Sequence, residues 1–152
     1  MLFRSHACGC STIVFEYLDM NGKKKGSKKQ LLHLWKKNTI QNTAIHKAHK
    51  YGIRIAHVCA RNTSKLAYDG SGAVLRGMKA GFDTYEKCRF QNGKIYNCDL
   101  SASYNIGARY FIRELEKTTS AKVWSGIVAK VPECQHRLQC TYSTLLKINS
   151  IL

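Results

Sequence analysis

Two carboxylates, Glu16 and Asp99, stand at positions where a solvated acid would not be expected. Acids are scarce in this chain, which has nine Asp and Glu against 25 Lys and Arg. Glu16 interrupts the apolar run STIVFEYLD (11–19), and an unpaired carboxylate buried in such a strand is costly unless it is paired, protonated or bound to a metal. The alternative is that Glu16 faces water at a sheet edge, which the hydrophobicity of the run disfavours.

Asp99 opens the stretch CDLSASYNIGAR (98–109), which predicts a helix. One interpretation is that Asp99 is simply the N-cap of that helix, because Asp is among the preferred capping residues. The small residues that follow would also let the helix approach a sheet closely: Ser101, Ala102, Ser103, Gly107 and Ala108. A strand carboxylate and a helix-start carboxylate could then share Mg²⁺ or Mn²⁺, which prefer oxygen ligands. Two such ions about 4 Å apart would clamp a phosphodiester undergoing hydrolysis.

The net charge of +16 over 152 residues favours a polyanionic partner, and nucleic acid is the usual one. An anionic membrane surface is the main competitor, but the chain contains no run of 18 apolar residues and its lysines cluster in a polar loop. The lysines predicted to contact phosphate are Lys23, Lys24, Lys25, Lys28, Lys29, Lys36 and Lys37. Arg109 and Arg113 are predicted to extend this track, while Tyr68, Phe82 and Tyr85 suit either base stacking or core packing.

The order of patterns predicts an α/β fold. An apolar strand (11–19), a basic loop, a helix (31–51) stopped by Gly52 and a second strand (52–58) make a parallel strand–helix–strand unit. The turn signals YDGSG and QNGK predict a small β-rich insertion, followed by a helix from residue 99 to about 117 and a helical tail. The predicted segments are therefore 1–59, 60–97, 98–118 and 119–152.

The stretches IVFEYLD, the lysine loop, RNTSK and CDLSASYNIGAR occur in an order that resembles the C-terminal half of TnpB proteins and related CRISPR effectors. Those are RNA-guided DNA endonucleases with a RuvC-like domain of the RNase H fold. The resemblance implies that Glu16 and Asp99 are catalytic metal ligands for Mg²⁺ or Mn²⁺ and that Thr63 and Ser64 belong to the nucleic-acid-binding set. It also implies DNA and guide RNA as partners, in a prokaryotic, nucleoid-associated cytoplasmic setting.

The sequence departs from that family in two respects. No acid precedes Glu16, so the first catalytic Asp of the family is absent, and the chain is expected to be a fragment whose missing acid comes from an upstream segment or chain. We therefore expect the isolated chain to be inactive. The alternatives are a non-catalytic DNA- or RNA-binding module and a decayed transposon protein that hardly folds, since a sheet without its first strands leaves an open edge.

The second departure concerns zinc. The paired CxxC motifs of the family's zinc ribbon are missing, so the insertion corresponds to a degenerate ribbon and zinc is not expected. The residues left for a makeshift site have the wrong spacing for a standard ribbon: His57, Cys59, Cys88 and Cys98. Seven cysteines without a secretory signal favour a reducing cytosol, where they would mostly be free thiols or metal ligands.

The basic loop yields a test by salt titration. If it contacts about five phosphates, the logarithm of the DNA-binding constant should fall against the logarithm of salt concentration with a slope of about −4.5. Replacing Lys23, Lys24, Lys25, Lys28 and Lys29 by Gln should abolish most of the binding and flatten that slope. Fluorescence anisotropy with a labelled oligonucleotide measures both quantities, and an unchanged slope would contradict the assignment.

Overall fold

The computed structural model describes residues 7–17 and 37–152. These residues form two compact units that divide between His57 and Val58. Both helices and small sheets are present, so the chain is a mixed α/β protein. The basic loop and the first residues of the predicted 31–51 helix lie outside the described residues.

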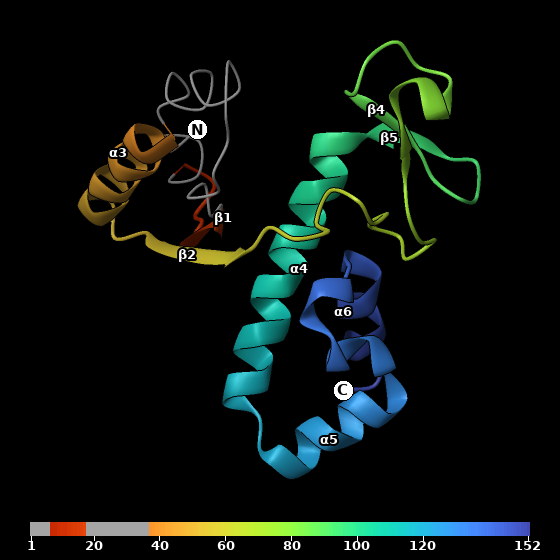
Figure 1. Ribbon diagram of the computed structural model, residues 1–152. Coiled ribbons are helices and arrows are strands. Elements are labelled where there is room, and N and C mark those ends of the chain that lie inside the picture. Colours follow the sequence, from red (N-terminus) through yellow and green to blue (C-terminus); the bar gives the residue numbers. More distant parts are fainter. Residues whose placement is uncertain (1–6, 18–36) are drawn as a thin grey trace, which may run out of the picture. The chain divides into compact units, whose positions relative to one another are not determined.

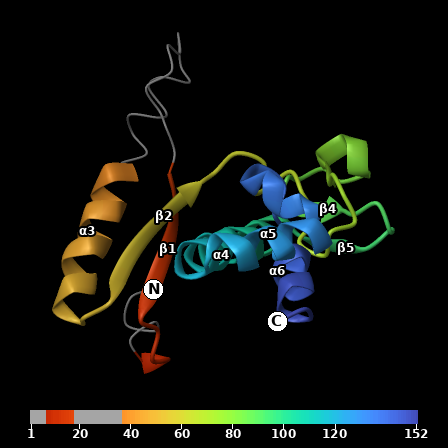
Figure 2. The same ribbon diagram turned by 90° about the horizontal axis from the view of Figure 1, so that it is seen from below.

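The first unit contains strand β1 (Thr12–Tyr17), helix α3 (Lys37–Lys50) and strand β2 (Arg54–Cys59). β1 and β2 are neighbours in one sheet, and α3 lies along them (Figure 2). The amide of Arg54 donates to the carbonyl of Ser11 at 2.9 Å. This bond joins the starting ends of the two strands, as a parallel pair requires. The strand–helix–strand order predicted from the sequence is confirmed.

Gly52 ends α3 as the sequence predicted. Its φ of 64° is left-handed, and its amide donates to the His49 carbonyl while the amide of Ile53 donates to that of Ala48. This pair of bonds is the Schellman arrangement, which satisfies helix carbonyls that would otherwise lack partners. The chain then turns directly into β2.

β1 is less buried than its composition predicted. Its residues from Thr12 to Glu16 are half-buried, and Tyr17 is 65% exposed. Among the described residues β2 is its one strand neighbour. A strand paired along a single edge keeps part of its surface accessible, so the prediction of a strand buried on both faces is wrong for the structure described.

The segment 60–97, predicted to be β-rich, contains a small three-stranded sheet. β3 (Leu75–Arg76), β4 (Lys87–Arg89) and β5 (Ile95–Asn97) form an antiparallel sheet in the order β3-β4-β5, with the short 3-10 helix η1 (Gly77–Ala80) after β3. A small core supports this sheet. It consists of Ala67, Cys88, Phe90 and Cys98.

The QNGK stretch forms the tip of the β4–β5 hairpin. The amide of Gly93 donates to the Phe90 carbonyl at 3.0 Å, and the amide of Phe90 donates to the Lys94 carbonyl at 2.8 Å. Gly93 has a φ of 85°, the left-handed conformation that closes a three-residue hairpin loop.

Helix α4 (Cys98–Thr118) connects the insertion to the tail. It is followed by α5 (Ala121–Lys130), the 3-10 helices η2 (Pro132–Gln135) and η3 (Arg137–Gln139), and α6 (Tyr142–Asn149). Figure 1 shows the hairpin at the start of α4, α5 beyond its end and α6 alongside it. A helical tail is confirmed, but PECQHRLQC forms two 3-10 turns, and α6 begins only at the capping box of Thr141 and Thr144.

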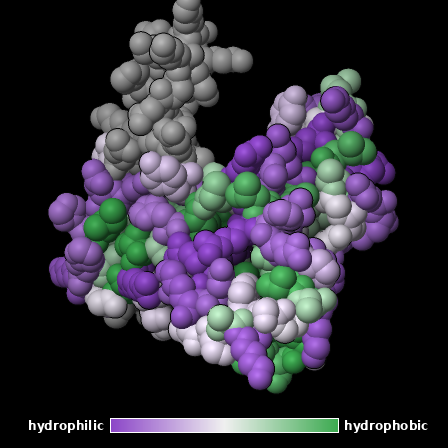
Figure 3. All heavy atoms as spheres, turned by 60° about the horizontal axis from the view of Figure 1, so that its bottom comes forward, coloured by the Kyte–Doolittle hydropathy of each residue, from purple (hydrophilic) through white to green (hydrophobic). Residues whose placement is uncertain are grey.

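A second core lies between α4 and the tail. Its buried residues are Ile112, Ile127, Val131, Cys134, Cys140 and Ile148. The face drawn in Figure 3 is mainly hydrophilic, with hydrophobic residues in separate patches. None of the helices in the described part of the chain is long and apolar enough to span a membrane.

Two glycine substitutions test the backbone assignments with opposite signs. Gly93→Ala forces a Cβ into a left-handed turn and should lower the free energy of unfolding by about 1 kcal/mol. Gly126→Ala should raise it by about 0.5–1 kcal/mol, because Gly126 lies inside α5 with open space around its Cα. Urea denaturation followed by circular dichroism measures both, and a stabilising Gly93→Ala would contradict the hairpin geometry.

Candidate nucleic-acid interface

Asp99 lies in the first turn of α4 and is exposed, but it does not cap the helix. The cap is Asn97, whose Oδ1 accepts from the amides of Asp99 at 2.9 Å and Leu100 at 3.0 Å. The interpretation of Asp99 as the N-cap is therefore wrong, because Asn97 at the end of β5 reaches those amides first. Among the described residues, no hydrogen bond or ion pair engages the Asp99 carboxylate, so it is available to a ligand.

Glu16 is half-buried near the end of β1, and its carbonyl accepts from Nε2 of Gln41 at 3.5 Å. It belongs to the first unit, whereas Asp99 belongs to the second. The predicted meeting of the two carboxylates at a metal therefore stays a prediction. Within residues 7–17 and 37–152, no three His, Cys, Asp or Glu side chains gather in a way that could hold a metal ion.

Two cysteines of the makeshift zinc set, Cys88 and Cys98, are buried together in the core of the insertion. Burial, with a hydrogen bond to Cys98, raises the pKa of the Cys88 thiol to about 11. Both thiols pack with Ala67 and Phe90, which gives them a structural role in that core. Cys59 is exposed, and His57 belongs to the first unit.

The predicted basic track falls largely outside the structure. Lys23, Lys24, Lys25, Lys28, Lys29 and Lys36 lie outside the described residues. Lys37 begins α3, and the last turn of that helix carries Lys47, His49 and Lys50. The lysine loop therefore rests on the sequence argument.

Arg109 is a core residue, which corrects its assignment to the nucleic-acid-binding set. It is 6% exposed. Its guanidinium donates to four backbone carbonyls, those of Cys59 (3.1 Å), Arg61 (2.6 Å), Leu138 (2.7 Å) and Cys140 (3.2 Å). A guanidinium engaged in this way stabilises irregular backbone and is not presented to a phosphate.

Asn105 makes a second buried connection one turn earlier on α4. Its Nδ2 donates to the carbonyls of Thr63 and Leu66, each at 2.9 Å, and its Oδ1 accepts from the amide of Tyr142 at 3.1 Å. We call Asn105 and Arg109 the α4 clamp. The clamp joins the stretch RNTSK to CDLSASYNIGAR, the two motifs that the sequence singled out in this part of the chain.

Thr63 and Ser64, also predicted to bind nucleic acid, serve this connection. Thr63 is 1% exposed, and its hydroxyl donates to the carbonyl of Ala60 at 2.9 Å. Ser64 is half-buried, and its carbonyl accepts from the guanidinium of Arg76. Thr63 is therefore a structural residue, because its buried side chain cannot reach a ligand on the surface.

Three tyrosines and one lysine form a surface that was not predicted from the sequence. Tyr68 lies with its ring centroid 5.1 Å from those of Tyr96 on β5 and Tyr104 on α4. The ammonium of Lys94 is 2.6 Å from the Tyr68 hydroxyl and lies over the rings of Tyr68 and Tyr96. The hydrogen bond with Tyr68 raises the pKa of Lys94, so the ammonium stays charged. We call these four residues the tyrosine–lysine surface.

The other predicted stacking residues have separate settings. Phe82 is half-buried beneath the guanidinium of Arg89, which lies 5.7 Å from the ring centroid. Tyr85 is 75% exposed. Of the predicted set, Tyr68 alone belongs to the tyrosine–lysine surface, and its neighbours come from segments that the sequence argument treated as strand and helix.

The tyrosine–lysine surface and Asp99 lie at the same end of α4, where β5 leads into the helix. Tyr104 is exposed, whereas Tyr68 and Tyr96 are half-buried and pack partly against the core of the insertion. Aromatic rings with an accessible face beside a cation suit unpaired bases and the phosphates between them. A free carboxylate at the same end of the helix suits a divalent cation bound to the same backbone. Comparison with known protein families, curated proteins and solved structures finds no match for this chain.

The buried role of Arg109 yields a test against the surface alternative. Arg109→Lys keeps the charge but cannot reach four carbonyls, so the free energy of unfolding should fall by about 2–4 kcal/mol. Arg113→Lys, on the same helix and 24% exposed, should change it by less than about 1 kcal/mol. Chemical denaturation measures both. If Arg109→Lys left stability intact and weakened only DNA binding, the buried assignment would fail.

Proposed function

We propose that this chain is the C-terminal part of a metal-dependent nuclease similar to TnpB, in which Asp99 supplies one metal ligand and the surface around it holds nucleic acid. The observation that carries the proposal is the Asp99 carboxylate, which the Asn97 cap leaves free and exposed in the first turn of α4. Its position on a chain of charge +16 supports a polyanionic substrate.

The α4 clamp accounts for part of the resemblance on structural grounds. The stretches RNTSK and CDLSASYNIGAR, which carry part of the resemblance, are joined by Asn105 and Arg109. Buried polar side chains that satisfy several backbone carbonyls are expensive to replace, because each lost donor leaves an unsatisfied acceptor. These contacts give a physical reason for those residue types at those positions, independent of the catalytic role.

One face of α4 supports the expectation of a fragment. Leu100 and Phe111 are 52% and 58% exposed, and nothing lies within 4 Å of a Cβ built on Gly107, which shares this face. Large apolar residues beside a glycine suit close packing against a sheet. An upstream segment or chain that supplies both a sheet and the missing acid would cover this face.

In the assembled site, Mg²⁺ or Mn²⁺ would polarise the phosphodiester and activate water. The carboxylate of Asp99 would hold the cation, together with Glu16 and an acid from the missing segment. Lys94 would contact a phosphate, and the tyrosines would stack against unpaired bases. Because the described residues contain no group of three ligands, we expect the isolated chain to bind the cation weakly and to cleave nothing.

A manganese titration tests the role of Asp99 without needing activity. Paramagnetic Mn²⁺ added to the labelled chain should broaden the amide signals of residues 97–100 before others, and Asp99→Asn should remove that effect. Asp83→Asn is the matched control, because Asp83 is an exposed acid in the insertion. Broadening that is equal at both acids, or that survives Asp99→Asn, would contradict the proposal.

The expectation that the isolated chain does not cleave DNA is checked with the same protein samples. Single-stranded DNA incubated with the chain and Mg²⁺ or Mn²⁺ should remain uncut above background. Robust cleavage that disappears in Asp99→Asn would show that the chain carries a complete site and would overturn the fragment hypothesis.

The second candidate is a non-catalytic nucleic-acid-binding module. The tyrosine–lysine surface favours it, since stacking and a phosphate contact from Lys94 require no metal. The manganese titration separates the two hypotheses. Under the second one, residues 97–100 show no preferential broadening, while binding to single-stranded DNA persists.

A further inference from the structure

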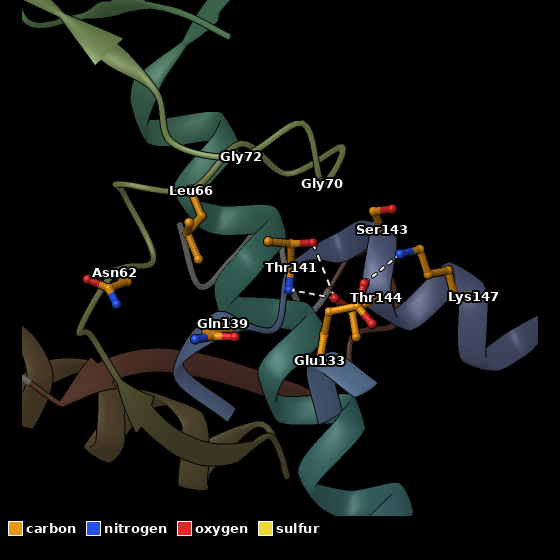
Figure 4. Close-up of a pocket in the computed structure, with 10 residues that line it drawn as sticks. All are labelled: Asn62, Leu66, Gly70, Gly72, Glu133, Gln139, Thr141, Ser143, Thr144 and Lys147. Carbon is orange, nitrogen blue, oxygen red and sulfur yellow. Dashed lines mark hydrogen bonds and ion pairs between the residues drawn. The ribbon is translucent and has the colours of Figure 1, made fainter. Parts of the chain in front are cut away.

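A cavity of about 350 Å³ lies within the second unit, where the 62–72 segment faces η3 and α6 (Figure 4). This volume is at the lower end of the roughly 300–1,000 Å³ typical of small-ligand sites. Seven of the ten lining residues have side chains with a hydrogen-bond donor or acceptor, and Leu66 is the one large apolar side chain. The cavity is distinct from Asp99 and from the tyrosine–lysine surface, none of whose residues line it.

Three polar side chains in this cavity have no hydrogen-bond partner within the described chain. They are the amides of Asn62 and Gln139 and the hydroxyl of Ser143, which come from three separate segments. Figure 4 shows Asn62 and Gln139 on one side of the cavity and Ser143 on the other. The remaining hydroxyls are engaged, because Thr141 and Thr144 cap α6 and contact each other at 3.4 Å.

The backbone around Asn62 and Gln139 is held by hydrogen bonds. Asn62 has a φ of 67°, and it is the one non-glycine residue with positive φ in the described part of the chain. Its neighbours Arg61 and Thr63 present their carbonyls to Arg109 and Asn105. Gln139 lies between Leu138 and Cys140, whose carbonyls both accept from Arg109. The α4 clamp therefore holds the backbone on either side of both amides, while the Asn62 side chain is half-buried and the Gln139 side chain is exposed.

The charge of the cavity narrows the class of ligand. Its one acid and one base, Glu133 and Lys147, form an ion pair at 2.5 Å. Because these two charges are paired with each other, the lining does not suit a divalent cation or a bare phosphate. Side-chain amides offer a donor and an acceptor together, which is the pattern that Asn and Gln use to bind the edge of adenine. Leu66 is the apolar side chain of the lining against which a flat ring would pack.

We propose that this cavity binds one adenine nucleotide, with Asn62 and Gln139 on the base edge and Ser143 on the ribose. The ligand is either an unpaired adenosine of a bound strand or a free mononucleotide. The first of these rests on the proposed nucleic-acid function, and the second does not.

The strand form is tested with two 12-nucleotide oligo-dT probes, one with a central dA and one with an abasic site there. Wild-type chain should bind the dA probe at least about fivefold more tightly, the lower bound for one good amide–base pair. Asn62→Gly should remove this preference while keeping the left-handed backbone. Gln139→Ala should also remove it, and Gln135→Ala, an exposed glutamine outside the cavity, should not.

The free form is tested by titrating adenosine monophosphate against ¹⁵N-labelled chain. Saturable shifts at residues 62, 139 and 143 that Asn62→Gly abolishes would support the proposal even if the probes are bound equally. Equal binding of both probes together with no such shifts would overturn it while leaving the nucleic-acid function intact. Failure of the chain to bind any oligonucleotide would count against the proposed function, and the mononucleotide titration would then decide the cavity by itself.

Discussion

The second unit depends on how one helix satisfies buried carbonyls of irregular backbone. The segments 59–66 and 138–142 cannot pair their carbonyls within a sheet, and a buried carbonyl without a donor costs about 1–3 kcal/mol. Arg109 serves four of these carbonyls and Asn105 serves two, while the Asn105 oxygen accepts the amide of Tyr142. Arginine suits this role because its five donors project from one rigid plane. The two side chains thus fix α4, the 59–66 segment and the start of α6 against one another, all within the second unit.

The same contacts place the side chains that remain free. Asn62 and Gln139 each lie between residues whose carbonyls the α4 clamp holds, so their amides project from immobilised backbone. The Tyr68 carbonyl accepts from the amide of Ser143 at 2.8 Å, which ties the loop above the cavity to α6. Tyr68 also centres the tyrosine–lysine surface. The cavity and the tyrosine–lysine surface are therefore connected through one short stretch of chain. A structural change at Tyr68 would alter both.

Local patterns predicted the elements well where a single residue governs the backbone. Gly52 ends α3 and Gly93 closes the hairpin, because each requires a left-handed conformation that other residues avoid. The side-chain roles were harder to predict. Arg109 has the same charge and nearly the same setting in sequence as Arg113. Only the tertiary position of the 59–61 and 138–140 carbonyls distinguishes the buried Arg109 from the half-buried Arg113. The prediction of a continuous helix in the tail was also wrong, since PECQHRLQC lacks the spacing that would distinguish 3-10 turns from an α-helix. The cavity depends on three distant segments and has no local signature.

The distribution of acids explains why Asp99 needs partners. Glu116 pairs with Arg137 and Glu133 with Lys147, which ties the tail together, while Glu114 contacts Arg113 and Lys117. Asp99 has no such pair among the described residues, and the helix N-terminus stabilises its negative charge instead. That same dipole opposes a cation, so a lone carboxylate there holds Mg²⁺ weakly. Further carboxylates would make the site favourable for a divalent ion. Each one increases the attraction for the cation, whereas the repulsion from the helix dipole stays constant. The free acid of α4 is thus suited to a shared site and poorly suited to act alone.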